Sequence, residues 1–131
     1  MEAGTGVLIS GSGVLELSGV MSGIKIPVEA SNDLREAQSQ FAGILPILML
    51  YIGSTGLKMT LGDAWAREGH MKRSLHYVRL AIDINLFRDG VYLKDTEDYR
   101  KAGEFWEALG GSWGGRWGDG DHFSLAWGGR K

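Results

Sequence analysis

The chain has 131 residues, of which 44% are hydrophobic and 23% are charged, and this size and composition predict one globular domain with its own core. The formal net charge of −2 and the lack of a basic block argue against a surface that binds nucleic acid. Because the chain contains no cysteine, disulfides, thiolate metal sites and a cysteine nucleophile are excluded, so any metal site must use His, Asp or Glu.

The start of the chain, MEAGTGVLIS, has no basic segment, so we expect no secretory signal. The longest apolar run, 44–52, contains Pro46 and is far shorter than the roughly 20 residues of a membrane-spanning helix. We therefore expect a soluble protein that is made in the cytoplasm, without membrane insertion.

Residues 1–30 differ from the rest of the chain because glycines separate short β-branched runs. This pattern predicts one or two small hairpins or a loosely held glycine-rich β arm. The segment contains no histidine, and we assign it no chemistry of its own. The chain thus divides into an arm, 1–30, and a domain, 31–131.

The first helix is predicted over 33–53, where Ser31, Asn32 and Asp33 offer an N-cap and apolar residues recur at helical spacing. Pro46 should kink this helix or divide it. A strand at 57–61 and a polar loop at 62–73 follow.

The second half of the domain begins with a strand at 80–86 and a turn at 88–90, "RDG". A helix over about 96–109 and a glycine-rich loop at 110–121 come next, and a strand at 122–127 closes the chain. The residues expected to be buried on the helix are Tyr99, Phe105, Trp106 and Leu109. In the last strand, one face carries His122, Ser124 and Ala126, and the other carries Phe123, Leu125 and Trp127. This order predicts an α+β fold with a small, largely antiparallel sheet and flanking helices.

Asp83 interrupts an apolar run in the second strand, and the alternation of a strand places it opposite Ile82 and Ile84, which face the core. A carboxylate half-enclosed by apolar neighbours needs a cation or a metal as its partner. Together with His76 and His122 it would make a set suited to Zn²⁺, with a fourth position open for water. By spacing alone, the two histidines could equally be surface or hydrogen-bonded core residues.

Two segments around these residues closely resemble the M15 family of zinc peptidases. The first, S-L-H-Y-V-R-L-A-I-D, matches the family pattern at Ser74, His76, Ala81 and Asp83. The second, W-G-G-R-W-G-D-G-D-H-F, matches it at Trp113, Gly114, Gly115, Asp119, His122 and Phe123. The resemblance covers about residues 39–128. The family includes D-Ala-D-Ala carboxypeptidases and phage endolysins that cut L-alanyl-D-glutamate bonds.

The resemblance implies the hedgehog/DD-peptidase-like fold of this family and a Zn²⁺ ion held by His76, Asp83 and His122. Asp119 would serve as general base and then as general acid. The substrate-binding candidates are Ser74, Arg67, Trp113 and His70. The implied substrate is the peptide stem of peptidoglycan. We expect a phage endolysin or a virion-associated wall hydrolase of the L-Ala-D-Glu endopeptidase type. It would act on the bacterial wall after release from the cell or as part of a virion. In the second case, the N-terminal arm could dock the protein to another virion protein.

Two positions depart from the family pattern. Arg79 replaces a glycine, which a chain accepts readily only if the backbone there needs no positive φ. Ala66 stands at the position of a family arginine, so either the adjacent Arg67 takes over its role or another cation does.

Two alternatives remain open. A D-Ala-D-Ala carboxypeptidase would need a cation for the terminal carboxylate, with Arg67, Arg73, Arg79 and Arg116 as candidates. A non-catalytic binding or structural module could also retain the fold. Among the cleft candidates, His70 could be a solvated loop residue and Trp113 could simply pack beneath the glycine loop, with Trp117 a further candidate for an aromatic wall.

Overall fold

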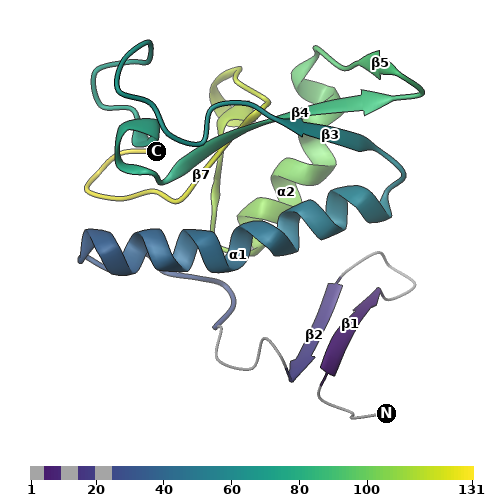
Figure 1. Ribbon diagram of the computed structural model, residues 1–131, viewed down its shortest axis with the longest axis horizontal. Coiled ribbons are helices and arrows are strands. Elements are labelled where there is room, and N and C mark those ends of the chain that lie inside the picture. The colour runs from purple at the N-terminus through teal and green to yellow at the C-terminus, as the bar shows by residue number, and fades with distance from the viewer. Residues whose placement is uncertain (1–4, 10–14, 20–24) are drawn as a thin grey trace.

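The computed structural model describes residues 5–9, 15–19 and 25–131, the first two segments as backbone only. Figure 1 shows helix α1 (Leu34–Ser54) running beneath the main sheet, with α2 (Arg100–Ala108) on the same side. The first two strands, β1 (Thr5–Ile9) and β2 (Leu15–Gly19), form an antiparallel pair within the predicted arm. The rest of that arm up to residue 24 lies outside the described residues.

The main sheet has five strands, and β4 (Ala81–Arg88) is its centre. The strand order is β3 (Lys58–Leu61), β4, β7 (His122–Ser124) and β6 (Ser112–Trp113), while β5 (Val91–Tyr92) pairs with the end of β4. Every pairing is antiparallel. The α+β class with a small antiparallel sheet is therefore confirmed.

Helix α1 begins where the sequence predicts, because the side chain of Asp33 accepts the N–H of Glu36 at 2.8 Å. Pro46 does not divide it. The proline removes one hydrogen bond to the carbonyl of Ala42, but both residues are exposed, so water can replace the missing partner. None of the helices in the described residues has the length and apolar character needed to cross a lipid bilayer.

The predicted second helix is a 3₁₀ turn, η2 (Thr96–Tyr99), followed by α2. The indole of Trp106 is fully buried and donates to the carbonyl of Ser124 at 2.8 Å, which ties α2 to β7. Phe105 is only half-buried, because it stacks on Tyr51 of α1 at the edge of the core, with ring centroids 4.0 Å apart.

Two strands differ in length from the prediction. β4 continues to Arg88 because Asp89 and Gly90 both have positive φ, which lets the chain turn tightly and pair as β5. β7 ends at Ser124, not at residue 127, because its partner β4 begins at Ala81, the residue opposite Ser124. The core-facing residues of both strands pack with the helices in one apolar cluster.

Candidate active site

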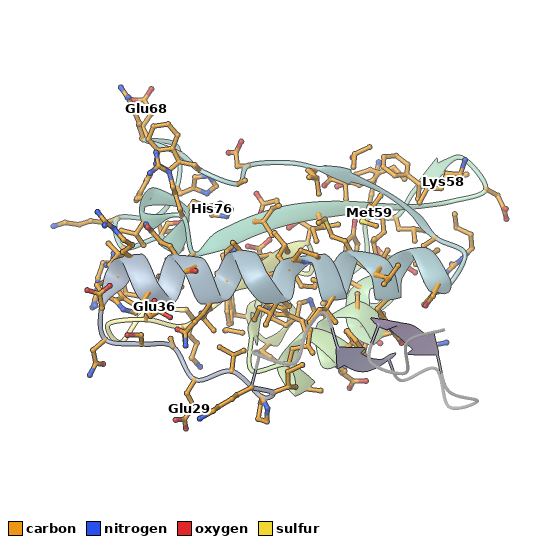
Figure 2. The ribbon with its side chains drawn as sticks, turned by 60° about the horizontal axis from the view of Figure 1, so that its bottom comes forward. Glu29, Glu36, Lys58, Met59, Glu68 and His76 are labelled. Carbon is orange, nitrogen blue, oxygen red and sulfur yellow. The ribbon has the colours of Figure 1, made fainter. Side chains whose placement is uncertain are left out.

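The two elements that carry Asp83 and His122 are adjacent strands in direct register. Asp83 of β4 lies opposite His122 of β7, so their side chains emerge on the same face of the sheet. His76 comes from the 3₁₀ turn η1 (Leu75–Val78), just before β4. Figure 2 shows His76 at one end of the sheet, with Lys58 and Met59 towards the other end. Ser74 caps η1, since its hydroxyl oxygen accepts the N–H of His76 at 3.2 Å.

The two imidazoles converge on a single carboxylate oxygen. His76 Nε2 lies 3.2 Å from Asp83 Oδ1, and His122 Nδ1 lies 3.9 Å from the same atom. Two ligand atoms of one tetrahedral zinc ion lie about 3.3 Å apart, given metal–ligand bonds of roughly 2.0–2.2 Å. The set therefore has the spacing and the donor types of a zinc site that keeps a fourth position open.

The opposite ring nitrogens, His76 Nδ1 and His122 Nε2, are buried and have no hydrogen-bond partner among the described residues. Buried polar atoms are nearly always paired, and the exceptions gather at catalytic and ion-binding sites. A histidine that holds a metal normally donates its second ring N–H to a neighbouring group, so these two nitrogens do not themselves mark the metal position.

The pKa values of the two histidines shift in opposite directions. Burial lowers the pKa of His122, with the charge of Asp119 opposing the shift, so this imidazole is neutral at pH 7, as a metal ligand must be. Burial also acts to lower the pKa of His76, but the hydrogen bond and charge of Asp83 outweigh it and the pKa is raised. A metal ion that binds at His76 near or below that pKa must displace a proton.

Asp119 is exposed and follows η3 (Gly114–Trp117), whose loop folds back onto β7. Its N–H donates to Gly114 at 2.9 Å, and its carbonyl accepts the N–H of His122 at 3.2 Å. A Cβ on Gly114 would lie 2.3 Å from the carbonyl oxygen of Asp119 and 2.7 Å from His122 Cβ. Glycine at this position therefore lets the loop bring Asp119 next to the histidine.

Asp121, two residues after Asp119, lies at the same site. Its carbonyl accepts the N–H of Ile84 at 2.9 Å. Burial, followed by a side-chain hydrogen bond with Asp119, raises the pKa of Asp121 to about 7 in the metal-free protein. Asp121 therefore holds a proton more readily than an ordinary carboxyl group does.

These residues line a cleft of about 690 Å³. His70, one of the substrate-binding candidates, lies in this cleft. Its ring stacks on that of His76, with centroids 4.1 Å apart, and its Nε2 lies 3.0 Å from Asp63 Oδ2. Tyr77 fixes the backbone of His70 by accepting its N–H at 2.8 Å and donating to its carbonyl at 2.7 Å. Ser74 lines the cleft as well.

Trp113 does not form a wall of this cleft. Its side chain is 1% exposed, packs over Gly103 of α2 and donates from Nε1 to the carbonyl of Gly120 at 2.8 Å. The tryptophan that faces the cleft is Trp117, which is 47% exposed, with its ring centroid 5.7 Å from that of His122. The strand β6 turns Trp113 into the core, and η3 leaves Trp117 on the surface.

Arg67 does not line the cleft either. Its side chain is exposed, and its guanidinium lies 5.2 Å from the ring centroid of Trp65. Arg79 also lies over this ring, at 4.4 Å. The backbone at residue 79 does have a positive φ, so the condition for an easy replacement of glycine is not met: Arg79, the C-cap of η1, has φ +58° and ψ +37°.

Four residues that line the cleft were not predicted from the sequence: Met71, Gly129, Arg130 and Lys131. Arg73 was predicted only as one of several candidate cations. A usable signal was present for Arg130, because the adjacent glycines Gly128 and Gly129 favour a tight turn that folds the following residue back. Nothing in the sequence pattern distinguishes Arg73 from Arg67.

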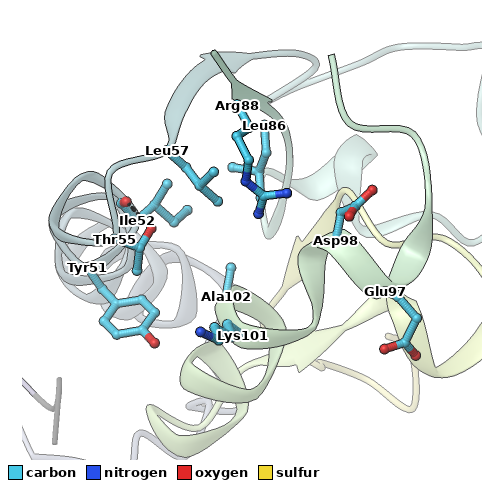
Figure 3. Close-up of a pocket in the computed structure, with 10 residues that line it drawn as sticks. All are labelled: Tyr51, Ile52, Thr55, Leu57, Leu86, Arg88, Glu97, Asp98, Lys101 and Ala102. Carbon is cyan, nitrogen blue, oxygen red and sulfur yellow. Dashed lines mark hydrogen bonds between the residues drawn. The ribbon is translucent and has the colours of Figure 1, made fainter. Parts of the chain in front are cut away.

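A second, smaller cavity of about 220 Å³ lies at the far end of β4, near Arg88 and Lys101 (Figure 3). No histidine is among the residues that line it, and within residues 25–131 the His-Asp-His group is the one cluster arranged to hold a metal ion. Within the described residues, the candidate metal site therefore lies in the larger cleft.

Residues 67–125 match a family model of the M15 peptidases that is described as D-alanyl-D-alanine carboxypeptidase. This segment belongs to the M15 peptidase family. It runs from the loop before η1 to the residue after β7, and so contains the three metal-ligand candidates and Asp119. At the level of the family, the M15 domain is a peptidase that acts on peptidoglycan. No curated protein matches the chain.

Proposed function

We propose that this M15 domain is a zinc-dependent peptidase that hydrolyses bonds in the peptide stems of peptidoglycan. His76, Asp83 and His122 hold the metal, and Asp119 is the general base. The observation that carries this proposal is the approach of two imidazole nitrogens to one carboxylate oxygen, at 3.2 and 3.9 Å, in a cleft that Asp119 also lines.

Zinc bound in such a site supplies a Lewis acid and makes water easier to deprotonate near neutral pH. Asp119 takes a proton from the attacking water and passes it to the leaving amine. Its exposed carboxylate can reach a substrate in the cleft, which Asp121 also lines. Asp83 reduces the net charge of the site while leaving one position free for the reaction.

The substrate side of the cleft offers both polar and apolar contacts. The hydroxyl oxygen of Ser74 already accepts the N–H of His76, but its hydrogen remains free to donate to a substrate carbonyl. His70, held by Asp63 and Tyr77, offers a second polar group beside the metal ligands. Trp117 offers a flat surface for the aliphatic part of a stem peptide.

For the bond that is cut, our first proposal is the L-Ala-D-Glu bond, with the protein acting as a phage endolysin or a virion-associated hydrolase whose N-terminal arm docks to another virion protein. A D-Ala-D-Ala carboxypeptidase is the second candidate, because the matching family model carries that description.

The test is a digest of purified peptidoglycan, with fragments identified by mass spectrometry. Zinc-loaded wild type and Asp95→Asn should release the same stem-peptide fragments, since Asp95 is exposed and its side chain caps nothing. Asp119→Asn should bind zinc and release essentially none. The fragment masses identify the bond. A zinc-loaded wild type that releases no fragment, or an Asp119→Asn protein that cleaves like the wild type, would overturn the proposal.

A further inference from the structure

The end of the described chain forms a tight turn that closes one side of the cleft. Trp127 and Arg130 exchange backbone hydrogen bonds of 2.9 and 3.0 Å, and Gly128 and Gly129 between them both have positive φ, as a type I′ turn requires. The indole of Trp127 donates to the carbonyl of Ser31 at 2.9 Å, which anchors the turn to the segment before α1. Figure 1 shows this end of the chain beside the segment that carries η1.

The turn brings two arginines to the same cleft from distant parts of the chain. Arg73, just before η1, donates from Nη2 to the carbonyl of Gly128 at 3.1 Å. Arg130 belongs to the turn itself, and its guanidinium lies 5.6 Å from the ring centroid of Trp127. Both arginines line the cleft that contains the His-Asp-His cluster.

Neither arginine forms a salt bridge with a carboxylate within residues 25–131. By contrast, Arg100 is paired with Glu97 of η2, and Arg116 is paired with Glu107 of α2. The acidic side chains that line the cleft are one of the metal-ligand candidates, Asp83, and two residues of the loop before β7, Asp119 and Asp121. A guanidinium group favours a carboxylate, which it can bind through two parallel hydrogen bonds.

We infer that Arg73 and Arg130 form a subsite for the α-carboxylate of the substrate residue that supplies the leaving amine. This inference rests on the proposed function. Both candidate substrates carry that group: the final residue of a D-Ala-D-Ala stem has a terminal carboxylate, and a D-glutamate joined through its side chain keeps its α-carboxylate free. The subsite thus takes over the role expected of Arg67, which lies outside the cleft.

The experiment compares matched peptides that differ at this one group. One pair ends in D-Ala-D-Ala with a free carboxylate or a carboxamide, and the other contains L-Ala-D-Glu or L-Ala-D-isoglutamine. KM and kcat are measured for zinc-loaded wild type, Arg73→Gln, Arg130→Gln and the control Arg88→Gln. Arg88 is exposed at the far end of β4 and has no ion pair among the described residues. The affinity of each uncleaved peptide for Asp119→Asn, with and without Arg130→Gln, is measured by calorimetry.

One of the two pairs should contain the true substrate. For that pair, the KM of the wild type and of Arg88→Gln should be roughly 10- to 100-fold lower for the carboxylate peptide than for the amide peptide, as a charge-assisted hydrogen bond implies. Arg73→Gln and Arg130→Gln should lose this preference with little change in kcat. The same loss should appear in the binding of peptides to Asp119→Asn.

Equal KM values of the wild type for carboxylate and amide peptides, or a preference that survives in both arginine variants, would overturn the subsite. Cleavage of neither pair would count against the proposed function, and the calorimetric comparison would then decide the subsite by itself. The pair that shows the preference identifies which stem carboxylate is bound.

Discussion

Gly103 of α2 gives the sharpest test of how the fold supports the site. Glycine within a helix costs about 0.5–1 kcal/mol relative to alanine, so the local rule predicts that Gly103→Ala stabilises the protein. The structure predicts the reverse. A Cβ at position 103 would lie 2.0 Å from Cδ2 of Trp113 and 2.3 Å from its Cε2, far inside the roughly 3.5–4.0 Å of a carbon–carbon contact.

Trp113 has little room to move away from such a Cβ, since it is fully buried and its indole N–H is bonded to the carbonyl of Gly120. Overpacking of this kind costs about 1–3 kcal/mol, so we expect Gly103→Ala to lower the free energy of unfolding by about 1–2 kcal/mol. Gly53 of α1 is the matched control, because a Cβ there meets no atom within 4 Å. Gly53→Ala should raise that free energy by up to about 1 kcal/mol.

The assay is urea denaturation of the metal-free proteins, followed by circular dichroism, so that metal binding does not contribute to the measured free energy. A Gly103→Ala protein as stable as the wild type would refute the packing argument. A loss of stability in Gly53→Ala equal to that in Gly103→Ala would also refute it, because the effect would then not depend on contact with Trp113.

Three further predictions concern single groups. Burial raises the pKa of Tyr99 to about 12, so the folded state disfavours the ionised phenol. The free energy of unfolding of the wild type should therefore fall as the pH rises from about 10 towards 12. In Tyr99→Phe, which has no phenol to ionise, the same fall should be less steep. At neutral pH, Tyr99→Phe should lower the free energy of unfolding by about 1–2 kcal/mol in urea titrations, because the hydroxyl bonds Leu93 and Leu86. Arg79→Gly should be more stable than Arg79→Ala by about 1 kcal/mol in the same assay, since both lose the contact with Trp65 and only glycine relieves the positive φ; equal stability would contradict this. Chelation of the metal should abolish peptide hydrolysis and lower the melting temperature, and added zinc should restore both.

The parts of the structure that the sequence predicted depend on local periodicity. The alternation of side chains along β4 predicted that Asp83 lies on one face of the strand and that Ile82 and Ile84 lie on the other. The structure has this arrangement, with both isoleucines buried and Asp83 half-buried. The α1 boundaries follow from the cap at Asp33 and differ by only one residue at each end. The order of helices and strands then restricted the fold to a small antiparallel sheet.

The parts that could not be predicted depend on how the chain turns between elements. Trp113 and Trp117 have nearly the same sequence surroundings, and only the short strand β6 and the turn η3 send one into the core and leave the other in the cleft. Likewise, Arg67 and Arg73 lie in one polar loop, and the hydrogen bond from Arg73 to Gly128 depends on a turn 55 residues away. Tertiary contacts of this kind leave no local signal.

The metal site is tested most directly by the zinc content of purified protein, measured by inductively coupled plasma mass spectrometry after loading with zinc and removal of the excess. We expect about one zinc ion per chain in the wild type and essentially none in His122→Ala. His70→Ala should retain the ion, because the ring of His70 stacks on His76 but is not a proposed ligand. A wild type that stays free of zinc, or a His122→Ala protein that binds it as tightly as the wild type, would contradict the assignment of His76, Asp83 and His122 as the metal site.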